Sequence, residues 1–96
     1  MIELSRVTKP PKVVIFRMRH VPYMDASGLS AFETAVKQLR RKGTTVVLSA
    51  VQIQPLDFMM RSGFVHHVGD ANLAPNIDVA LERARAILAG PSPAGA

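Results

Sequence analysis

The stretch "VVIFRMRHVPYMDASGLSAF", residues 13–32, places an apolar strand directly before a helix. The run over 12–18 is β-branched and aromatic at consecutive positions, which is typical of a strand covered on both faces. The apolar residues that follow recur at spacings of three and four, on one side of a helix: Leu29, Phe32, Val36 and Leu39. Between the two elements, Asp25 and Ser27 are both candidate N-caps, with the Ser27 hydroxyl in reach of the Ser30 N–H.

The same alternation continues to the end of the chain. "TTVVLSA" (44–50) predicts a second strand, "QPLDFMMRSG" (54–63) a short helix, and "FVHHVG" (64–69) a brief third strand. "NIDVALERARAILA" (76–89) predicts the last helix, capped by Asn76, whose apolar face would hold Ile77, Ala80, Leu81, Ala84 and Leu88. Alternating strands and helices with short connections predict an α/β domain with a parallel sheet.

Length and composition limit the classes of protein that fit. The chain has 96 residues, enough for one domain, and 48% of them are hydrophobic. It has no cysteine, which excludes disulfide scaffolds and thiolate metal sites. Apolar runs stay well below the roughly 18 residues that span a bilayer, and the N-terminus lacks the apolar region of a secretory signal.

The formal net charge is +5, with 12 Lys and Arg against 7 Asp and Glu. Such an excess suits nucleic acid, an anionic membrane surface or an acidic protein. About half of it has an ordinary explanation, because Lys37, Arg40, Arg41 and Lys42 close a helix, where cations favour the dipole. With one Tyr and no Trp there is no set of stacking aromatics, so the sequence does not favour nucleic-acid binding. Lys9, Arg17 and Arg19 would suit an anionic inner leaflet.

In this order of elements, and in its strand–loop–helix motif with Asp25, Ser27 and Gly28, the chain resembles a STAS domain over about residues 12–88. "GTTVVLSAVQIQPLDFMMRSGF" (43–64) and "HHVGDANLAPNIDVALERA" (66–84) are similar to the branch found in sulfate-permease (SulP) anion transporters. The resemblance implies a sheet with helices packed on one side, begun by strands that precede residue 12. We therefore expect an N-terminally truncated domain: 1–11 as the remnant of a preceding helix or edge strand, 12–89 as the STAS domain and 90–96 as a disordered tail.

The resemblance also implies a function. It predicts a cytosolic regulatory domain of an anion transporter (for sulfate, dicarboxylates or bicarbonate), on the cytoplasmic side of the bacterial inner membrane. Its partners would be the membrane region of the parent transporter or a cytosolic regulatory protein, with a dimer left open. No reaction, metal or cofactor is expected. The alternative is a free-standing anti-sigma-factor antagonist, which would be switched by phosphorylation of Ser27.

The candidate site residues lie in two segments. Ser27 is the candidate phosphorylation site, since a helix N-terminus accommodates a phosphate. Asp25, Ser27, Gly28 and Leu29 are candidates for partner binding or weak GTP or ATP binding, through N–H groups expected to be free at Gly28 and Leu29. The second segment, expected beside the first, comprises Ser49, Ala50, Val51 and Gln52.

The histidines do not predict chemistry. Neighbouring residues of a strand point to opposite faces, so His66 and His67 are not expected to bind one metal ion. His20 lies near Ser27 and Asp25 in the sequence, but neither an oxyanion hole nor a substrate cleft is evident, so a hydrolase triad is not predicted.

Overall fold

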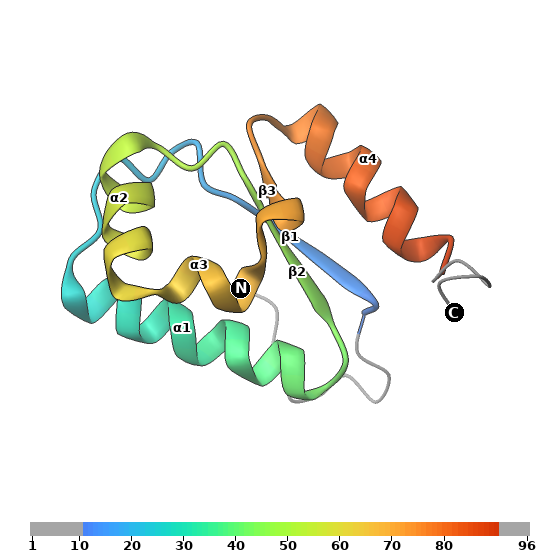
Figure 1. Cartoon of the computed structure of the whole chain (residues 1–96), viewed down its shortest axis with the longest axis horizontal. Helices are drawn as coiled ribbons and strands as arrows, with labels where there is room; N and C mark the ends of the chain where they lie inside the picture. Colours follow the sequence, from blue (N-terminus) through green and yellow to red (C-terminus); the bar gives the residue numbers. More distant parts are fainter. Residues whose placement is uncertain (1–10, 91–96) are drawn as a thin grey trace.

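The computed structural model describes residues 11–90. Strands and helices alternate as expected, except that more than one helix separates the second strand from the third (Figure 1). The first half contains β1 (Val13–Arg17), α1 (Ala26–Arg41) and β2 (Thr45–Ser49). The second half contains α2 (Ile53–Ser62), α3 (Phe64–Val68), the 3₁₀ turn η2 (Asp70–Asn72), β3 (Leu73–Ala74) and α4 (Ile77–Leu88).

The strands form one parallel sheet in the order β1-β2-β3. Val13 of β1 pairs with Thr45 of β2, and the register continues to the end of both strands. Leu48 of β2 pairs with Leu73 of β3. The predicted α/β class with parallel strands is therefore confirmed, and β2 is the central strand of the described sheet.

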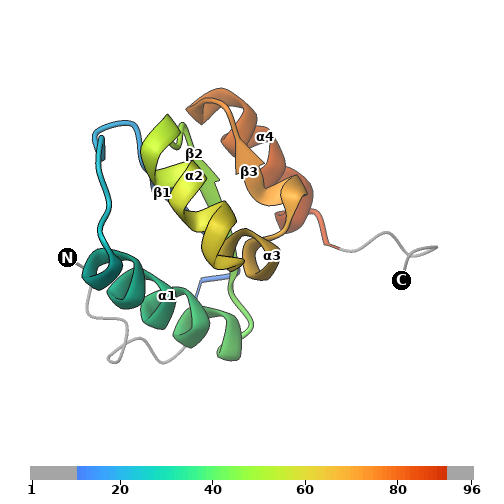
Figure 2. The ribbon, with the colours of Figure 1, turned by 60° about the vertical axis from the view of Figure 1, so that its left-hand side comes forward.

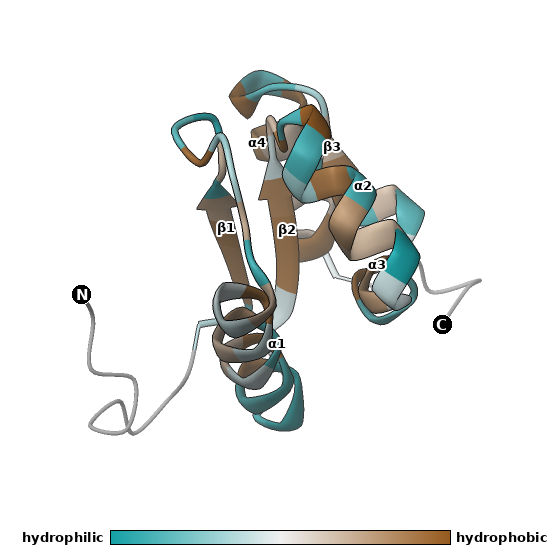
Figure 3. Ribbon diagram, turned by 90° about the vertical axis from the view of Figure 1, so that its left-hand side faces the viewer, coloured by the Kyte–Doolittle hydropathy of each residue, from teal (hydrophilic) through white to brown (hydrophobic). Residues whose placement is uncertain are grey.

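Helices cover both faces of the sheet. Val46 and Leu48 belong to one core cluster with residues of α1, α2 and α3, whereas Val47 between them packs with Ala80 of α4. Figures 1 and 2 show α4 on the side of the sheet opposite α1. Figure 3 shows that β1 and β2 are largely hydrophobic along their length. Successive side chains of a strand point to opposite faces, so helices must shield both faces of this sheet from water. The expectation that the helices pack on one side is corrected here: it is wrong for α4.

Three aromatic rings hold the α1 face together. Phe16 of β1 meets Phe32 of α1 edge to face, with ring centroids 5.1 Å apart. Phe32 in turn meets Phe64 of α3 at 5.6 Å, also edge to face. Such pairs add about 0.5–1.5 kcal/mol each beyond the area they bury. The chain of rings therefore fixes α1 and α3 against the sheet and against each other.

The predicted third strand over 64–69 is wrong, because this segment forms helix α3. Gly63 ends α2 with a φ of 81°, a left-handed conformation that glycine adopts without strain. The chain then turns at once into α3, which buries Phe64, Val65 and Val68 on one side. The strand that pairs with β2 comes later and has only two residues, Leu73 and Ala74.

The last helix, α4, is capped by Asn76 as predicted, but fewer of its residues are buried than predicted. The Asn76 side chain accepts a hydrogen bond from the Val79 N–H at 2.9 Å. Ala80 and Ala84 are buried, but Leu81 and Leu88 are 40% and 55% exposed. The face against the sheet is centred on the two alanines, so the two leucines lie outside it.

Two predicted segments fall largely or wholly outside the part of the chain that the structure describes. Of the expected N-terminal remnant, 1–11, only residue 11 is described, and the expected tail is described only at residue 90. Among the described helices, none combines the length and the apolar character that crossing a membrane requires.

Candidate docking surface at the start of helix α1

The start of α1 is capped by Asp25, one of the two candidates. Its side chain accepts a hydrogen bond from the Gly28 N–H at 2.7 Å, and its carbonyl accepts from the Leu29 N–H at 2.9 Å. Ser27 lies inside the helix, as its second residue, and is exposed. The predicted N-cap role of Ser27 is therefore wrong, and its hydroxyl lies at the surface instead.

The cap changes what the helix start offers to a ligand. The N–H groups of Gly28 and Leu29 were expected to be free, but Asp25 occupies both of them. That expectation is wrong. The first-turn amides that come before them in α1 belong to Ala26 and Ser27.

Gly28 lets the cap form at close range. A Cβ atom at this position would lie 3.2 Å from Asp25 Oδ1, tighter than an ordinary van der Waals contact. The Asp-x-Ser-Gly motif thus has a local reason: the aspartate caps, the glycine makes room for it, and the serine between them is left exposed. Leu29, the fourth candidate, is buried and anchors the helix start in the core.

The second candidate segment lies beside the first, because two glutamine side chains join them. Gln54 Nε2 donates to the Met24 carbonyl at 3.0 Å, and Gln54 Oε1 accepts from the Met24 N–H at 2.7 Å. Gln52 Nε2 donates to the Arg19 carbonyl at 2.5 Å. The loop that leads into α1 and the loop that leads into α2 are therefore held together at one end of the domain.

The residues of the second segment differ in their access to a partner. Ser49 is only 2% exposed, and its carbonyl accepts from the Met18 N–H at 2.8 Å, so it supports the sheet end. Ala50 has a φ of 56°, unusual for a residue with a Cβ. Ala50, Val51 and Gln52 are half-buried. A partner reaching this end would therefore meet 50–52 rather than the Ser49 side chain.

Two apolar side chains that sequence reasoning missed stand out from the same end. Tyr23 is 67% exposed, next to Met24, and Ile53 is 88% exposed, between Gln52 and Gln54. Their exposure makes these two side chains candidates for contact with another protein. We call Tyr23, Ser27, Gln52 and Ile53 the docking surface.

His66 and His67 lie on α3, apart from this surface. They were expected to point to opposite faces of a strand, but both are exposed on this helix. Over residues 11–90, no three His, Cys, Asp or Glu side chains come together in a group that could hold a metal ion.

Comparison with known proteins gives consistent matches. A model of the STAS domain family matches residues 2–80. The putative sulfate transporter YvdB of Bacillus subtilis (strain 168) is 29% identical over 66 residues, which are 69% of this chain and 12% of that protein. The present chain thus spans about an eighth of the length of this curated relative.

Two solved structures share the fold. The crystal structure of a sulfate transporter family protein from Wolinella succinogenes matches with a TM-score of 0.83 and 32% identity, covering 90% of this chain and 70% of that one. The STAS domain of a SulP transporter from Vibrio cholerae matches with a TM-score of 0.84 and 24% identity, covering 90% and 67%. The second match, at this identity, shows the fold alone.

Proposed function

Because this chain belongs to the STAS domain family, in the branch of the sulfate transporter (SulP) proteins, we propose that it is the regulatory domain of an anion transporter. In this proposal it lies on the cytoplasmic side of a bacterial inner membrane and docks on the membrane region of its parent protein. That region would select the anion, whether sulfate, a dicarboxylate or bicarbonate. The domain itself would carry out no reaction.

The observation that carries this proposal is the docking surface. Tyr23, before α1, and Ile53, the first residue of α2, expose apolar area to water, while Gln52 and Gln54 hold the segments that carry them together. Full burial of a large aliphatic side chain is worth about 1.5–3 kcal/mol. Two such anchors on a pre-organised surface suit a docking contact, since less ordering entropy is lost on binding.

The proposal is tested by removing the anchors, both in the full transporter and in a domain expressed apart from the membrane region. In a Tyr23→Ser and Ile53→Ser double variant we expect at least about tenfold weaker co-purification of the domain with the membrane region. Uptake of labelled sulfate should change in the same variant. Leu88→Ser is the matched control, because Leu88 is also exposed but lies on α4. Undiminished docking of the double variant would refute the proposal.

Phosphorylation of Ser27 is the regulation that we propose for this surface. Ser27 is exposed in the first turn of α1, within the docking surface. A phosphate would add about −1.5 to −2 charges there, beside the Asp25 carboxylate, and would oppose a partner fitted to a hydroxyl. Mass spectrometry of the protein from its native host should find the phosphoserine, and Ser27→Asp should weaken docking. A serine that stays unmodified under all growth conditions would count against this regulation.

The exposure of Ser27 also supports a second candidate function, a free-standing anti-sigma-factor antagonist switched at this serine. Its partners would be a cytosolic kinase and an anti-sigma factor rather than a membrane region. The reading frame around the chain separates the two. Membrane-spanning segments in the same polypeptide would favour the transporter, and a short polypeptide without them would favour the switch.

Weak GTP or ATP binding at the start of α1 remains a separate proposal. Because Asp25 occupies the Gly28 and Leu29 amides, a nucleotide phosphate would have to use those of Ala26 and Ser27. Titration with GTP and ATP, followed by amide shifts of Ala26 to Gly28, tests it. If the amide shifts of these residues do not change at millimolar nucleotide, the proposed nucleotide binding is refuted.

A further inference from the structure

The opposite end of the domain carries three pockets around the start of β2. The first, of about 320 Å³, and the third, of about 440 Å³, share Gly43 and Thr45. The second, of about 400 Å³, shares Arg40 with the first. Thr45 is the first residue of β2 and Ser49 is its last. These pockets therefore lie at the N-terminal end of β2, and the docking surface lies at its C-terminal end.

Among residues 11–90, every charged residue that lines these pockets is basic. No Asp or Glu of the described chain is among their lining residues. The lining side chains that carry or can carry positive charge are Lys12, Lys37, Arg40, Arg41, His67 and Arg83. Like charges gathered around a hollow create a positive potential that attracts anions.

The dipole of α1 does not account for this gathering. It explains Arg40 and Arg41, which lie in the last turn of α1. It does not explain Lys12 before β1, His67 on α3 or Arg83 on α4, because these come from other elements. Four separate parts of the fold thus bring basic groups to this end of the domain.

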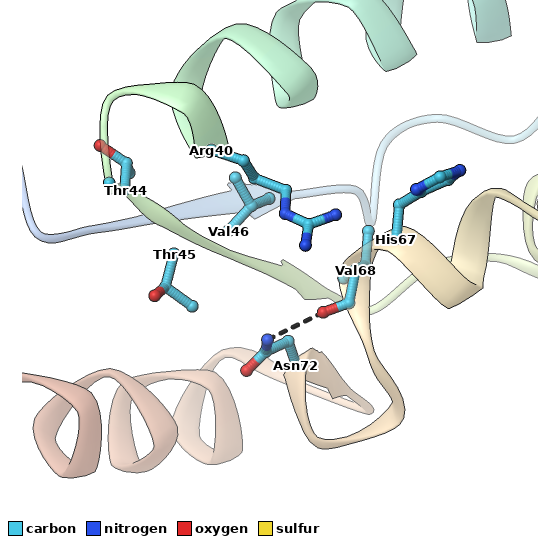
Figure 4. Close-up of a pocket in the computed structure, with 8 residues that line it drawn as sticks. Arg40, Thr44, Thr45, Val46, His67, Val68 and Asn72 are labelled. Carbon is cyan, nitrogen blue, oxygen red and sulfur yellow. Dashed lines mark hydrogen bonds between the residues drawn. The ribbon is translucent and has the colours of Figure 1, made fainter. Parts of the chain in front are cut away.

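The first pocket is lined by two basic side chains from different helices, Arg40 and His67. Figure 4 shows the Arg40 guanidinium reaching from the end of α1 over Val46 toward the segment that carries His67 and Val68. Both Arg40 and His67 are exposed, so their polar groups are open to a ligand from solvent. Thr44 also lines the pocket, but its hydroxyl donates to the Pro11 carbonyl at 2.6 Å.

Asn72 joins the first pocket to the third. Its Nδ2 donates to the Val68 carbonyl at 2.9 Å, and its Oδ1 accepts from Arg83 Nε at 2.8 Å. Arg83 is half-buried, and this hydrogen bond holds its side chain in place. The bond uses one of the five N–H donors of the guanidinium and leaves the other four for a ligand. A held guanidinium loses less freedom when it binds an anion.

We propose that this end of the domain is a binding site for a ligand that bears a phosphate or sulfate group. Arg40 and His67 bind the oxyanion in the first pocket, and the neighbouring basic groups strengthen the field there. Guanidinium groups suit such oxyanions because they donate paired hydrogen bonds to two oxygens. This inference is independent of docking at the other end, so failure of the Tyr23 and Ile53 experiment leaves it intact.

Amide NMR titration of the 96-residue chain tests the site. Sodium sulfate and sodium phosphate are added at constant ionic strength against sodium chloride. We expect saturable shifts at Gly43, Thr45 and Val68, and at least about tenfold weaker binding in Arg40→Gln. Arg61→Gln is the matched control, since it removes one exposed positive charge of α2 that lines none of the three pockets. It should bind as the parent does.

Vesicles distinguish the source of the oxyanion. Retention on vesicles with phosphate headgroups, lost in Arg40→Gln and kept in Arg61→Gln, supports the site with a lipid as its ligand. Saturable binding of free sulfate or phosphate without retention supports it with a soluble ligand. The proposal is overturned if shifts in sulfate and phosphate equal those in chloride and vesicles do not retain the chain. Equal effects of the two variants would also overturn it.

Discussion

The side chain of Gln54 hydrogen-bonds both backbone groups of Met24, thirty residues earlier in the chain. Its amide group donates to the Met24 carbonyl and accepts from the Met24 N–H, as the backbone of a paired strand would. Met24 is buried, so these groups have little access to water. The glutamine therefore fixes the position of Tyr23 and of the α1 cap relative to Ile53.

Removal of this contact should loosen that end of the domain. Gln54→Ala leaves two buried backbone groups of Met24 without partners, and we expect a loss of about 1–3 kcal/mol in unfolding free energy. Gln54→Glu should also destabilise, because a carboxylate cannot donate to the Met24 carbonyl. Urea denaturation and hydrogen exchange of the Met24 amide measure both effects. Gln38→Ala, at an exposed position of α1, is the control. A Met24 amide that stays protected in Gln54→Ala would contradict the role given to Gln54.

The assignment of the N-cap to Asp25 gives a second prediction. Asp25→Ala removes the bond to the Gly28 N–H and should cost about 1 kcal/mol. Asp25→Asn keeps an oxygen acceptor and should cost much less. Ser27→Ala should change stability by less than about 0.5 kcal/mol, because Ser27 is exposed inside the first turn. Thermal unfolding of the three variants checks the order, and a larger loss in Ser27→Ala than in Asp25→Ala would reverse the assignment.

The aromatic chain through Phe32 predicts where the core is most sensitive. Phe64 is fully buried and touches the Phe32 ring, so Phe64→Ala should cost about 3–5 kcal/mol. Because this approaches the whole stability of a small domain, Phe64→Leu is the better variant to measure. We expect it to lower the unfolding free energy by more than Met60→Leu, which changes an exposed side chain of α2. Equal effects of the two variants in denaturant titration would show that α3 is not part of the core.

Much of this fold was predictable from the period of its apolar residues. β1 and β2 are continuous apolar runs, and α1 shows the three-four spacing through Leu29 and Val36. The segment over 64–69 misled because Phe64, Val65 and Val68 suit either a short strand or a short helix. The left-handed turn at Gly63 decides for the helix. β3 gave no signal, since two residues cannot show a period.

The candidate site was predictable only in part. The Asp-x-Ser-Gly corner and its proximity to the loop after β2 came from the sequence and the resemblance. The exposure of Tyr23 and Ile53 did not, because it depends on how the two loops pack. The contact of Gln54 with Met24 likewise has no local pattern, and neither has the presence of Arg40 and His67 in the lining of one pocket, since they lie 27 positions apart in the chain.

Backbone conformation gives a final, paired prediction. Ala50 and Gly63 both have positive φ, 56° and 81°, but only the second is a glycine. Gly63→Ala should destabilise by about 1 kcal/mol, because a Cβ is strained there. Ala50→Gly removes the same kind of strain, which is worth about 1–2 kcal/mol, and loses part of the gain to a freer unfolded chain. We therefore expect it to be neutral or to stabilise slightly. Chemical denaturation measures the unfolding free energy of both variants, which should fall in Gly63→Ala and should not fall in Ala50→Gly. A clear loss of stability in Ala50→Gly would mean that the Ala50 methyl group makes contacts that outweigh its strain.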